Sequence, residues 1–167
     1  PFLDGNGRVG RLLITFLLMK KEVLEKPVLF LSSYFKKHQK IYYNKLSGYH
    51  EGDVFEWVDF FLDGVIETAH EAISISGEIR KIRDRDMEKI QALSKRESTS
   101  GVKVLNYLFE NPIVTTKSIM KATGFTRAGA QKVIDRFIKL DILVEEPKKS
   151  NYDVKYTYEK YFMTFII

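Results

Sequence analysis

The sequence predicts a mainly α-helical protein with one small β-hairpin near its C-terminus. Apolar residues recur every three or four positions over much of residues 8–140, which is the period of an amphipathic helix. The stretches ILVEE (142–146) and YDVKYTY (152–158) are instead short and rich in β-branched and aromatic residues, and the turn-forming PKKSN separates them. The 167 residues suffice for one or two domains.

The first predicted element is a helix over residues 8–21. It is apolar almost throughout, and Thr15 is the one polar residue between Leu12 and Met19. A helix that is apolar on all sides is typical of the interior of a domain. We therefore expect this helix to be buried on most of its surface and central to the N-terminal part.

Two further helices are predicted before residue 76. Ser32 or Ser33 is placed to cap the first of them, which extends to about Leu46. Asp53 is placed to cap the second. The apolar residues of that second helix recur at helical spacing and are Val54, Val58, Phe61, Leu62, Val65, Ala69 and Ile73.

Gly77 interrupts this pattern, and residues 77–98 are predicted to form a linking helix. The segment is strongly charged, and its narrow apolar stripe consists of Ile79, Ile82, Ile90 and Leu93. The stretch STSG (98–101) is the predicted hinge, because serine and glycine favour irregular backbone. We therefore expect one domain over residues 1–76 and a second over residues 99–167.

The second domain is predicted to contain three short helices and the β-hairpin. The first helix ends near Pro112, the second begins at Thr115 or Thr116, and the third begins at Thr126. The turn between the last two helices contains Gly124, as a helix-turn-helix requires. Three helices followed by a hairpin are the order of a winged helix-turn-helix domain.

Composition and charge limit the classes of function. The chain contains no cysteine, so a disulfide framework and a thiolate metal site are excluded, and we expect a cytoplasmic protein. No apolar run approaches the roughly 20 residues that a membrane span needs. Of the net charge of +5, residues 99–167 hold most, with 11 Lys and Arg against 7 Asp and Glu. This excess permits contact with nucleic acid but does not require it.

The opening stretch PFLDGNGRVGR (1–11) places Arg8 and Arg11 in the first turn of a helix, where the helix dipole disfavours cations. A bound polyphosphate would make this placement favourable. The backbone N–H groups of the GNG turn and two guanidinium groups three residues apart would bind its oxygens. Asp4 could hold a Mg²⁺ that the phosphates also bind.

Two other readings of the opening stretch compete with this one. In the first, the arginines are simply solvated and GNG is a plain turn. In the second, Gly5–Gly10 matches the G-x-G-x-x-G pattern of dinucleotide-binding folds. That pattern needs alternating strands and helices around it, and the chain instead stays helical for some 70 residues, so we discount the match.

The opening stretch also resembles the signature of the Fic (filamentation induced by cAMP) family, H-P-F-x-[D/E]-G-N-G-R-x-x-R. The matching positions are Pro1, Phe2, Asp4, Gly5, Asn6, Gly7, Arg8 and Arg11. The apolar helix, the Tyr-Tyr pair, the EGD loop and the Trp57 helix resemble the downstream order of that family. The resemblance covers about residues 1–75, as the C-terminal part of a Fic core, and Fic proteins with an appended winged helix are a familiar arrangement.

The resemblance implies an adenylyltransferase that moves AMP from ATP to a Ser, Thr or Tyr hydroxyl of a protein target. In this resemblance Asp4 binds Mg²⁺, and Gly5, Asn6 and Gly7 form a cradle for the phosphates. Arg8 and Arg11 neutralise the departing pyrophosphate, and the implied catalytic residues are Asn6, Arg8 and Arg11. Tyr42 and Tyr43 line the implied adenine pocket. A core or surface role for the two tyrosines stays open. Gly7 favours AMP transfer, because the subgroup that transfers phosphate has lysine there.

One departure from the family pattern concerns the general base. The family uses the histidine immediately before the proline of the motif, and this chain begins at that proline, Pro1. None of its three histidines has the matching position. We therefore expect this chain to be an inactive fragment of an active full-length protein.

The third helix of the second domain is the element that enters the major groove in a DNA-bound winged helix. Candidate DNA-binding residues are Arg127, Gln131, Lys132 and Arg136 on the helix and Lys148 and Lys149 on the wing. The basic side chains would contact phosphates, whereas Arg127 and Gln131 could reach bases. A protein-binding or homodimer surface is the alternative, and the apolar C-terminal YEKYFMTFII could join it. A DNA-binding regulator with a nucleotide-sensing or vestigial Fic part is therefore the rival function.

Overall fold

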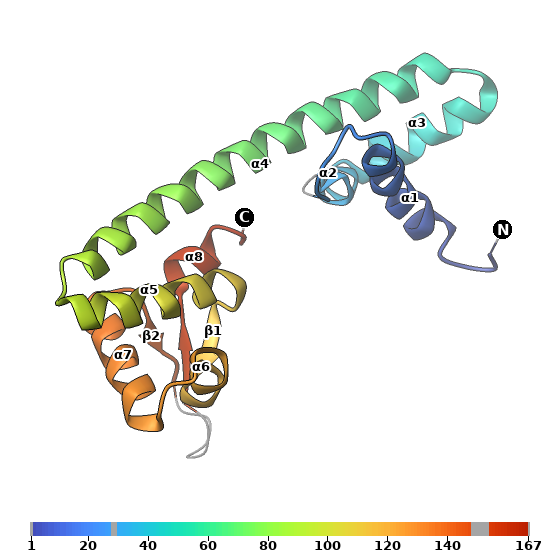
Figure 1. Cartoon of the computed structure of the whole chain (residues 1–167). Helices are drawn as coiled ribbons and strands as arrows, with labels where there is room; N and C mark the ends of the chain where they lie inside the picture. Colours follow the sequence, from blue (N-terminus) through green and yellow to red (C-terminus); the bar gives the residue numbers. More distant parts are fainter. Residues whose placement is uncertain (1, 28–29, 148–153, 167) are drawn as a thin grey trace. The chain divides into compact units, whose positions relative to one another are not determined.

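The computed structural model describes residues 2–27, 30–147 and 154–166. Over these residues the chain is mainly α-helical, with eight helices and one antiparallel sheet of three short strands, which confirms the predicted fold class at that level. The chain forms two compact units, Pro1–Ser74 (unit 1) and Ile75–Ile167 (unit 2), and helix α4 (Val54–Gln91) contributes to both (Figure 1). Within the described ranges, none of the helices combines the length and apolar content needed to cross a membrane.

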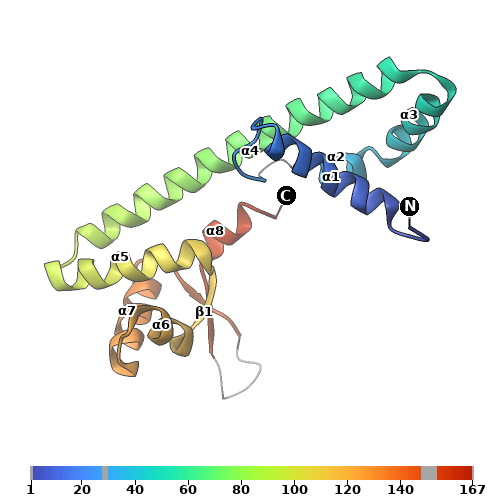
Figure 2. The same ribbon diagram turned by 45° about the vertical axis from the view of Figure 1, so that its right-hand side comes forward.

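Unit 1 consists of α1 (Asn6–Lys20), α2 (Leu31–Lys37), α3 (Gln39–Glu51) and the first part of α4, and α3 runs beside the start of α4 (Figure 2). Gly64 of α4 lets Tyr34 pack closely, because a Cβ at this glycine would lie 2.6 Å from the tyrosine ring. The buried core residues are Leu31, Tyr34, Phe35 and Phe60, and Ile14, Leu18, Leu24, Tyr42, Trp57, Phe61, Val65 and Ala69 pack around them.

The single helix predicted from Ser32 or Ser33 to about Leu46 is two helices, which meet at His38. The predicted serine cap is also wrong, since α2 begins at Leu31 and the residue before it is Phe30. The Ser33 hydroxyl donates a hydrogen bond to the Phe30 carbonyl at 2.7 Å and therefore does not cap an N–H of the first turn.

Helix α1 has almost the predicted bounds, but its predicted burial is wrong. None of its residues is buried, and only Ile14 and Leu18 pack against the core of unit 1. Leu12 is 71% exposed and Phe16 is 58% exposed. An apolar composition on all sides shows that a helix can be covered, but it does not show which segments cover it. Among the described residues, other segments of unit 1 cover α1 on one side only.

Unit 2 contains the second part of α4 and all later elements. These are α5 (Lys95–Glu110), β1 (Ile113–Thr115), α6 (Thr116–Thr123), α7 (Arg127–Lys139), β2 (Val144–Glu145), β3 (Lys155–Thr157) and α8 (Glu159–Met163). The strand order is β1-β3-β2, and both pairings are antiparallel. Strands β2 and β3 lie inside the two predicted strands. Strand β1 was not predicted, and it pairs Val114 with Tyr156, 42 positions later in the chain.

The ends of α6 and α7 follow the local signals in the sequence. The Thr115 hydroxyl accepts the N–H of Ser118 and the Ser118 hydroxyl accepts the N–H of Thr115, which is a capping box at the start of α6. The Thr126 hydroxyl accepts the N–H of Gly129 at the start of α7. Gly124 ends α6 with φ 75°, a left-handed backbone that glycine adopts without strain. These three predictions are confirmed.

Two predicted interruptions are absent from the part of the chain that the structure describes. Gly77 lies inside α4, since a single glycine weakens a helix by only about 1 kcal/mol. The predicted hinge, residues 98–101, lies inside α5. The break between the two helices comes earlier, since α4 ends at Gln91 and α5 begins at Lys95. Gly101 is buried because α5 packs on α4: a Cβ on it would lie 2.7 Å from Ile90 Cγ2. The whole of the predicted linking segment, residues 77–98, lies in unit 2.

A buried carboxylate joins α4 to the end of the sheet in unit 2. Asp86 is fully buried, and its Oδ2 accepts the hydroxyl of Tyr158 at 2.7 Å. Arg85 donates from Nε at 2.9 Å, and Lys89 lies 3.4 Å away. Around this group, the core of unit 2 consists of Ile90, Val104, Leu105, Leu108, Val114, Ile119, Ala130, Val133, Ile134, Phe137, Ile142, Leu143, Tyr156 and Tyr158.

The hydrogen bond of Tyr158 predicts a stability loss at alkaline pH. Burial, and then the hydrogen bond to Asp86, raise the pKa of the Tyr158 hydroxyl above its ordinary value. The pKa of this hydroxyl is therefore higher in the folded state than in the unfolded state. The protonated hydroxyl makes its full contribution to the free energy of unfolding below about pH 10. Above that pH the contribution falls by about 1.4 kcal/mol per pH unit. We expect urea unfolding between pH 9 and 11 to show a shallower decline for Tyr158→Phe. An identical decline in both proteins would contradict this.

Candidate functional site

The loop before α1 is closed by its own polar groups. Gly5 precedes the helix with φ 83°, a left-handed backbone that favours glycine. The Asp4 carboxylate accepts the N–H of Gly5 at 2.6 Å. The Asn6 side chain accepts the N–H of Phe2 at 3.0 Å and donates to the carbonyl of Phe2 at 2.8 Å. The amide of Asn6 is therefore used to shape this loop.

The start of α1 presents unbonded donors. The first intrahelical hydrogen bond runs from the N–H of Val9 to the carbonyl of Gly5 at 3.0 Å, so the N–H groups of Asn6, Gly7 and Arg8 precede it. No side chain in the described part of the chain caps this end. These three N–H groups, which have no partner among the described residues, and the positive end of the helix dipole together favour an anion.

The two arginines fold back over the glycines of this turn. Arg8 Nη2 lies 3.7 Å from the Cβ position of Gly5, and Arg11 Nη1 lies 3.3 Å from that of Gly7. A side chain at Gly7 would push against the Arg11 guanidinium. Arg8 also lies 3.5 Å from the Asp4 carboxylate, but both groups are largely exposed, and such a pair contributes little to stability. The turn therefore carries two guanidinium groups directed over its backbone.

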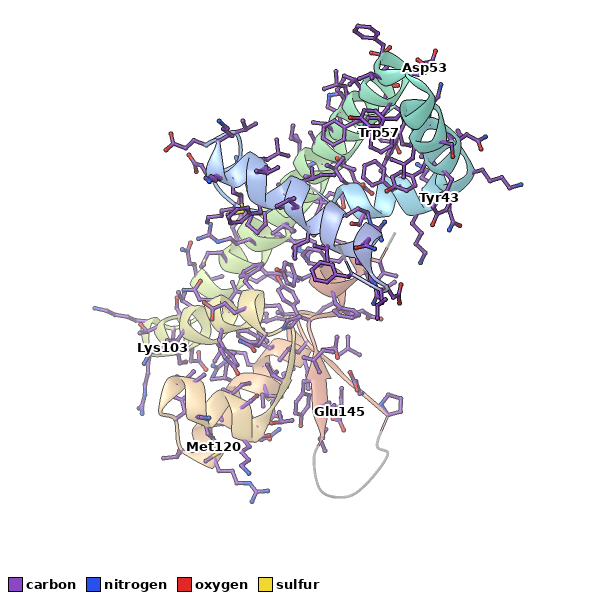
Figure 3. The ribbon with its side chains drawn as sticks, turned by 90° about the vertical axis from the view of Figure 1, so that its right-hand side faces the viewer. Tyr43, Asp53, Trp57, Lys103, Met120 and Glu145 are labelled. Atoms are coloured by element: carbon purple, nitrogen blue, oxygen red, sulfur yellow. The ribbon has the colours of Figure 1, made fainter. Side chains whose placement is uncertain are left out.

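A cavity of about 370 Å³ adjoins these guanidinium groups within unit 1. Its size is that of a small-molecule site. Arg8, Arg11 and Lys36 give the cavity its cations. Three of its aromatic rings pack together: Phe35 and Tyr42 lie 4.9 Å apart between centroids, and Tyr42 and Tyr43 lie 5.3 Å apart. Tyr43 lies on α3 (Figure 3). The cavity is lined by Arg8, Arg11, Ser32, Phe35, Lys36, Gln39, Tyr42 and Tyr43.

The structure thus brings four of the predicted site residues to one cavity, which are Arg8, Arg11, Tyr42 and Tyr43. Asp4, Gly5, Asn6 and Gly7 do not line it. Sequence reasoning missed Ser32, Lys36 and Gln39. Their spacing of three and four positions from each other and from Tyr43 would have placed them on one helical face.

Asp4 is the predicted magnesium ligand, and its geometry fits that role in part. One carboxylate oxygen is bound by the N–H of Gly5, and the other lies near Arg8. The side chain is 92% exposed, so it can supply one oxygen ligand to an ion whose other ligands are phosphate oxygens and water. Among the described residues, no three His, Asp or Glu side chains gather to hold a metal on their own.

The predicted DNA-binding residues differ in how free they are. Arg127 and Lys132 are exposed on α7. Gln131 donates to Asp135 at 2.9 Å and accepts from Thr116 at 3.0 Å, so its amide must leave these partners to reach a base. Arg136 donates to Glu97 at 2.5 Å. Lys148 and Lys149 lie outside the described residues.

No family model matches the sequence of this chain. Two features of the molecule bear on its function. One is the motif at the start of α1 with its adjoining cavity, and the other is the charge on unit 2.

Proposed function

We propose that unit 1 is part of a Fic-type adenylyltransferase and binds ATP through its triphosphate. The observation that carries this proposal is the meeting of Arg8 and Arg11 with Tyr42 and Tyr43 at one cavity. Cations and aromatic rings that line one space of about 370 Å³ suit a molecule with an anionic tail and a planar base. The eight residues that match the Fic signature support the same reading.

Each part of the site then has a distinct task. The first-turn N–H groups of α1 bind phosphate oxygens, and Arg8 and Arg11 neutralise the charge on the departing pyrophosphate. The rings of Tyr42 and Tyr43 pack against the base. Asp4 would hold Mg²⁺, which supplies further charge neutralisation. Asn6 keeps the turn in shape through its two hydrogen bonds to Phe2, so its proposed role changes from phosphate contact to positioning.

The transfer itself needs a general base. In the Fic pattern, the histidine before Pro1 takes the proton of the target hydroxyl. The hydroxyl oxygen then forms a bond to the α-phosphorus of ATP, and the bond from that phosphorus to the β-phosphate oxygen breaks. Such a base contributes about 10²–10⁴-fold to the rate.

The test is a transfer assay on the full-length protein, in which the Fic pattern requires a histidine immediately before Pro1. With Mg²⁺ and ATP labelled on the α-phosphate, we expect label on a protein hydroxyl, and we expect replacement of that histidine by alanine to abolish it. ATP labelled on the γ-phosphate is the matched control and should leave no label. Calorimetry on the same protein that detected no Mg²⁺-dependent uptake of ATP would overturn the proposal.

The second candidate function is DNA binding by unit 2, which the positive charge of that unit favours. Residues 75–167 hold 18 Lys and Arg against 12 Asp and Glu, a net charge of +6, whereas residues 1–74 hold 9 against 10. We propose that unit 2 is a winged helix-turn-helix domain. The order of α5, α6 and α7, the left-handed turn at Gly124 and the antiparallel sheet support this assignment.

A further inference from the structure

Two adjoining cavities form a trough between the first half of α5 and the N-terminal half of α7. Their volumes are about 510 and 470 Å³, and Arg96, Ser100 and Phe125 line both. We call them the α5–α7 trough. Its cations are Lys95, Arg96, Lys103, Lys132 and Arg136. Lys103 lies at the edge of unit 2 that is remote from Glu145 of β2 (Figure 3).

The charge of the trough is largely uncompensated. Glu97 is its one acidic residue. The Ser94 hydroxyl and Arg136 hold the pKa of Glu97 below its usual value, so this carboxylate stays ionised and cancels the charge of Arg136. Within the described ranges, no ion pair reaches Lys95, Arg96 or Lys132. The trough is therefore strongly positive as it stands.

Two of these cations stand where the local structure disfavours them. Lys95 and Arg96 are the first two residues of α5, at the positive end of its dipole. Glu97 is the acidic residue of the same turn, and it is paired with Arg136, so the placement of Lys95 and Arg96 costs stability in the absence of an external anion. Lys103 differs, since its ammonium lies 5.9 Å above the Phe125 ring and 3.4 Å from the carbonyl of Thr123.

We infer that the α5–α7 trough binds the sugar–phosphate backbone of duplex DNA. An extended polyanion fits two consecutive cavities with cations on two helices better than a small anion does. Lys132 lines the trough and is exposed on α7, the predicted recognition helix, so the positive surface of the trough reaches that helix. The Phe125 ring offers an apolar surface to a deoxyribose between two phosphates. The net charge of +6 on unit 2 favours the same partner.

This inference rests on the second candidate function and is independent of AMP transfer. It adds Lys95, Arg96 and Lys103 to the surface that the sequence had placed on α7 and the wing alone. Phosphate contacts of this kind set affinity and orientation but do not read the bases. The trough is therefore expected to act equally on all duplex sequences.

The test measures binding of the full 167-residue chain to a labelled 30-base-pair duplex by fluorescence anisotropy over a range of salt concentrations. The trough variant is Lys95→Gln with Arg96→Gln. The matched control is Arg80→Gln with Lys81→Gln, which removes the same charge from exposed positions of α4 in unit 2. We expect the trough variant to lower the slope of log K against log salt by about 2. Its affinity at 0.1 M salt should fall by roughly 10- to 100-fold, and the control should change little.

A melting experiment separates lost contacts from lost structure. Because the two cations oppose the dipole of α5, the trough variant should melt at the same temperature as the parent chain or higher. Weaker DNA binding together with unchanged or raised melting supports the inference. Equal losses of DNA affinity in the trough variant and the control would overturn the trough as the DNA-binding surface, while leaving the proposal that unit 2 binds DNA intact. Tighter binding of an acidic peptide than of the duplex would overturn DNA as the partner, and no salt-dependent binding to DNA would overturn both.

Discussion

Replacement of Asp86 by alanine is expected to lower the free energy of unfolding of unit 2 by about 2–4 kcal/mol. The change leaves the buried hydroxyl of Tyr158 without its acceptor and takes the shared carboxylate from Arg85 and Lys89. It also opens space in a fully buried position. Urea unfolding followed by circular dichroism measures the loss, and unit 2 should unfold at a lower urea concentration than in the parent chain.

Asp84→Ala is the control for this prediction. Asp84 is an exposed acidic residue on the same helix, so its removal should change stability by no more than about 0.5 kcal/mol. Tyr158→Phe keeps the ring and removes only the hydroxyl, and it should cost less than the loss of Asp86. Equal stability of the Asp86 and Asp84 variants would show that the buried carboxylate does not hold α4 to the end of the sheet.

In the full-length protein, Arg11→Ala is expected to slow AMP transfer by about 10²–10³-fold. The Arg11 guanidinium lies over Gly7 and lines the cavity, so it is placed to meet negative charge that grows as pyrophosphate departs. An interaction made mainly with the transition state lowers kcat more than it raises KM. Single-turnover transfer with ATP labelled on the α-phosphate measures the rate.

Lys20→Ala is the matched control, because it removes one cation from the other end of α1 and does not line the cavity. It should transfer AMP at the parent rate. Arg8→Ala should also slow AMP transfer. The effect should be smaller than that of Arg11→Ala if the Asp4 carboxylate still offsets part of the charge of Arg8 when ATP is bound. A parent-like rate for the Arg11 variant would remove the proposed role of the arginine pair.

The helix ends of unit 2 could be predicted because their causes are local. Thr115 and Thr126 cap helices through residues three positions away, and Gly124 supplies its own backbone conformation. Strand β1 had no such local signal. It consists of three residues between Pro112 and the Thr116 start of α6, and it exists because β3 lies beside it in the fold.

Gly101 was misinterpreted for the same kind of reason. A glycine beside serines favours a flexible segment on local grounds, but this one is buried against Ile90, and its missing Cβ permits the contact. The burial of α1 was also beyond local reasoning, because the pattern on Leu12 and Phe16 says nothing about which segments lie next to them. Long-range packing decided both cases.

For the candidate site, the sequence predicted which residues come together better than it predicted what each of them contacts. The misplaced charges of Arg8 and Arg11 indicated an anion site, and both line the cavity. The motif assigned Asn6 to phosphate, whereas its side chain binds the backbone of Phe2. Lys36 joined the arginines without belonging to any motif, because it reaches the cavity from another helix.

The strand order of unit 2 has a consequence for its synthesis on the ribosome. β3 is the last strand to be translated, yet it is the middle of the sheet, with β1 and β2 on its two sides. A nascent chain that has released only α5, α6 and α7 has no strand to join β1 to β2 and lacks Tyr158 to meet Asp86. Cooperative folding of this unit is therefore expected only after β3 and Tyr158 have left the exit tunnel.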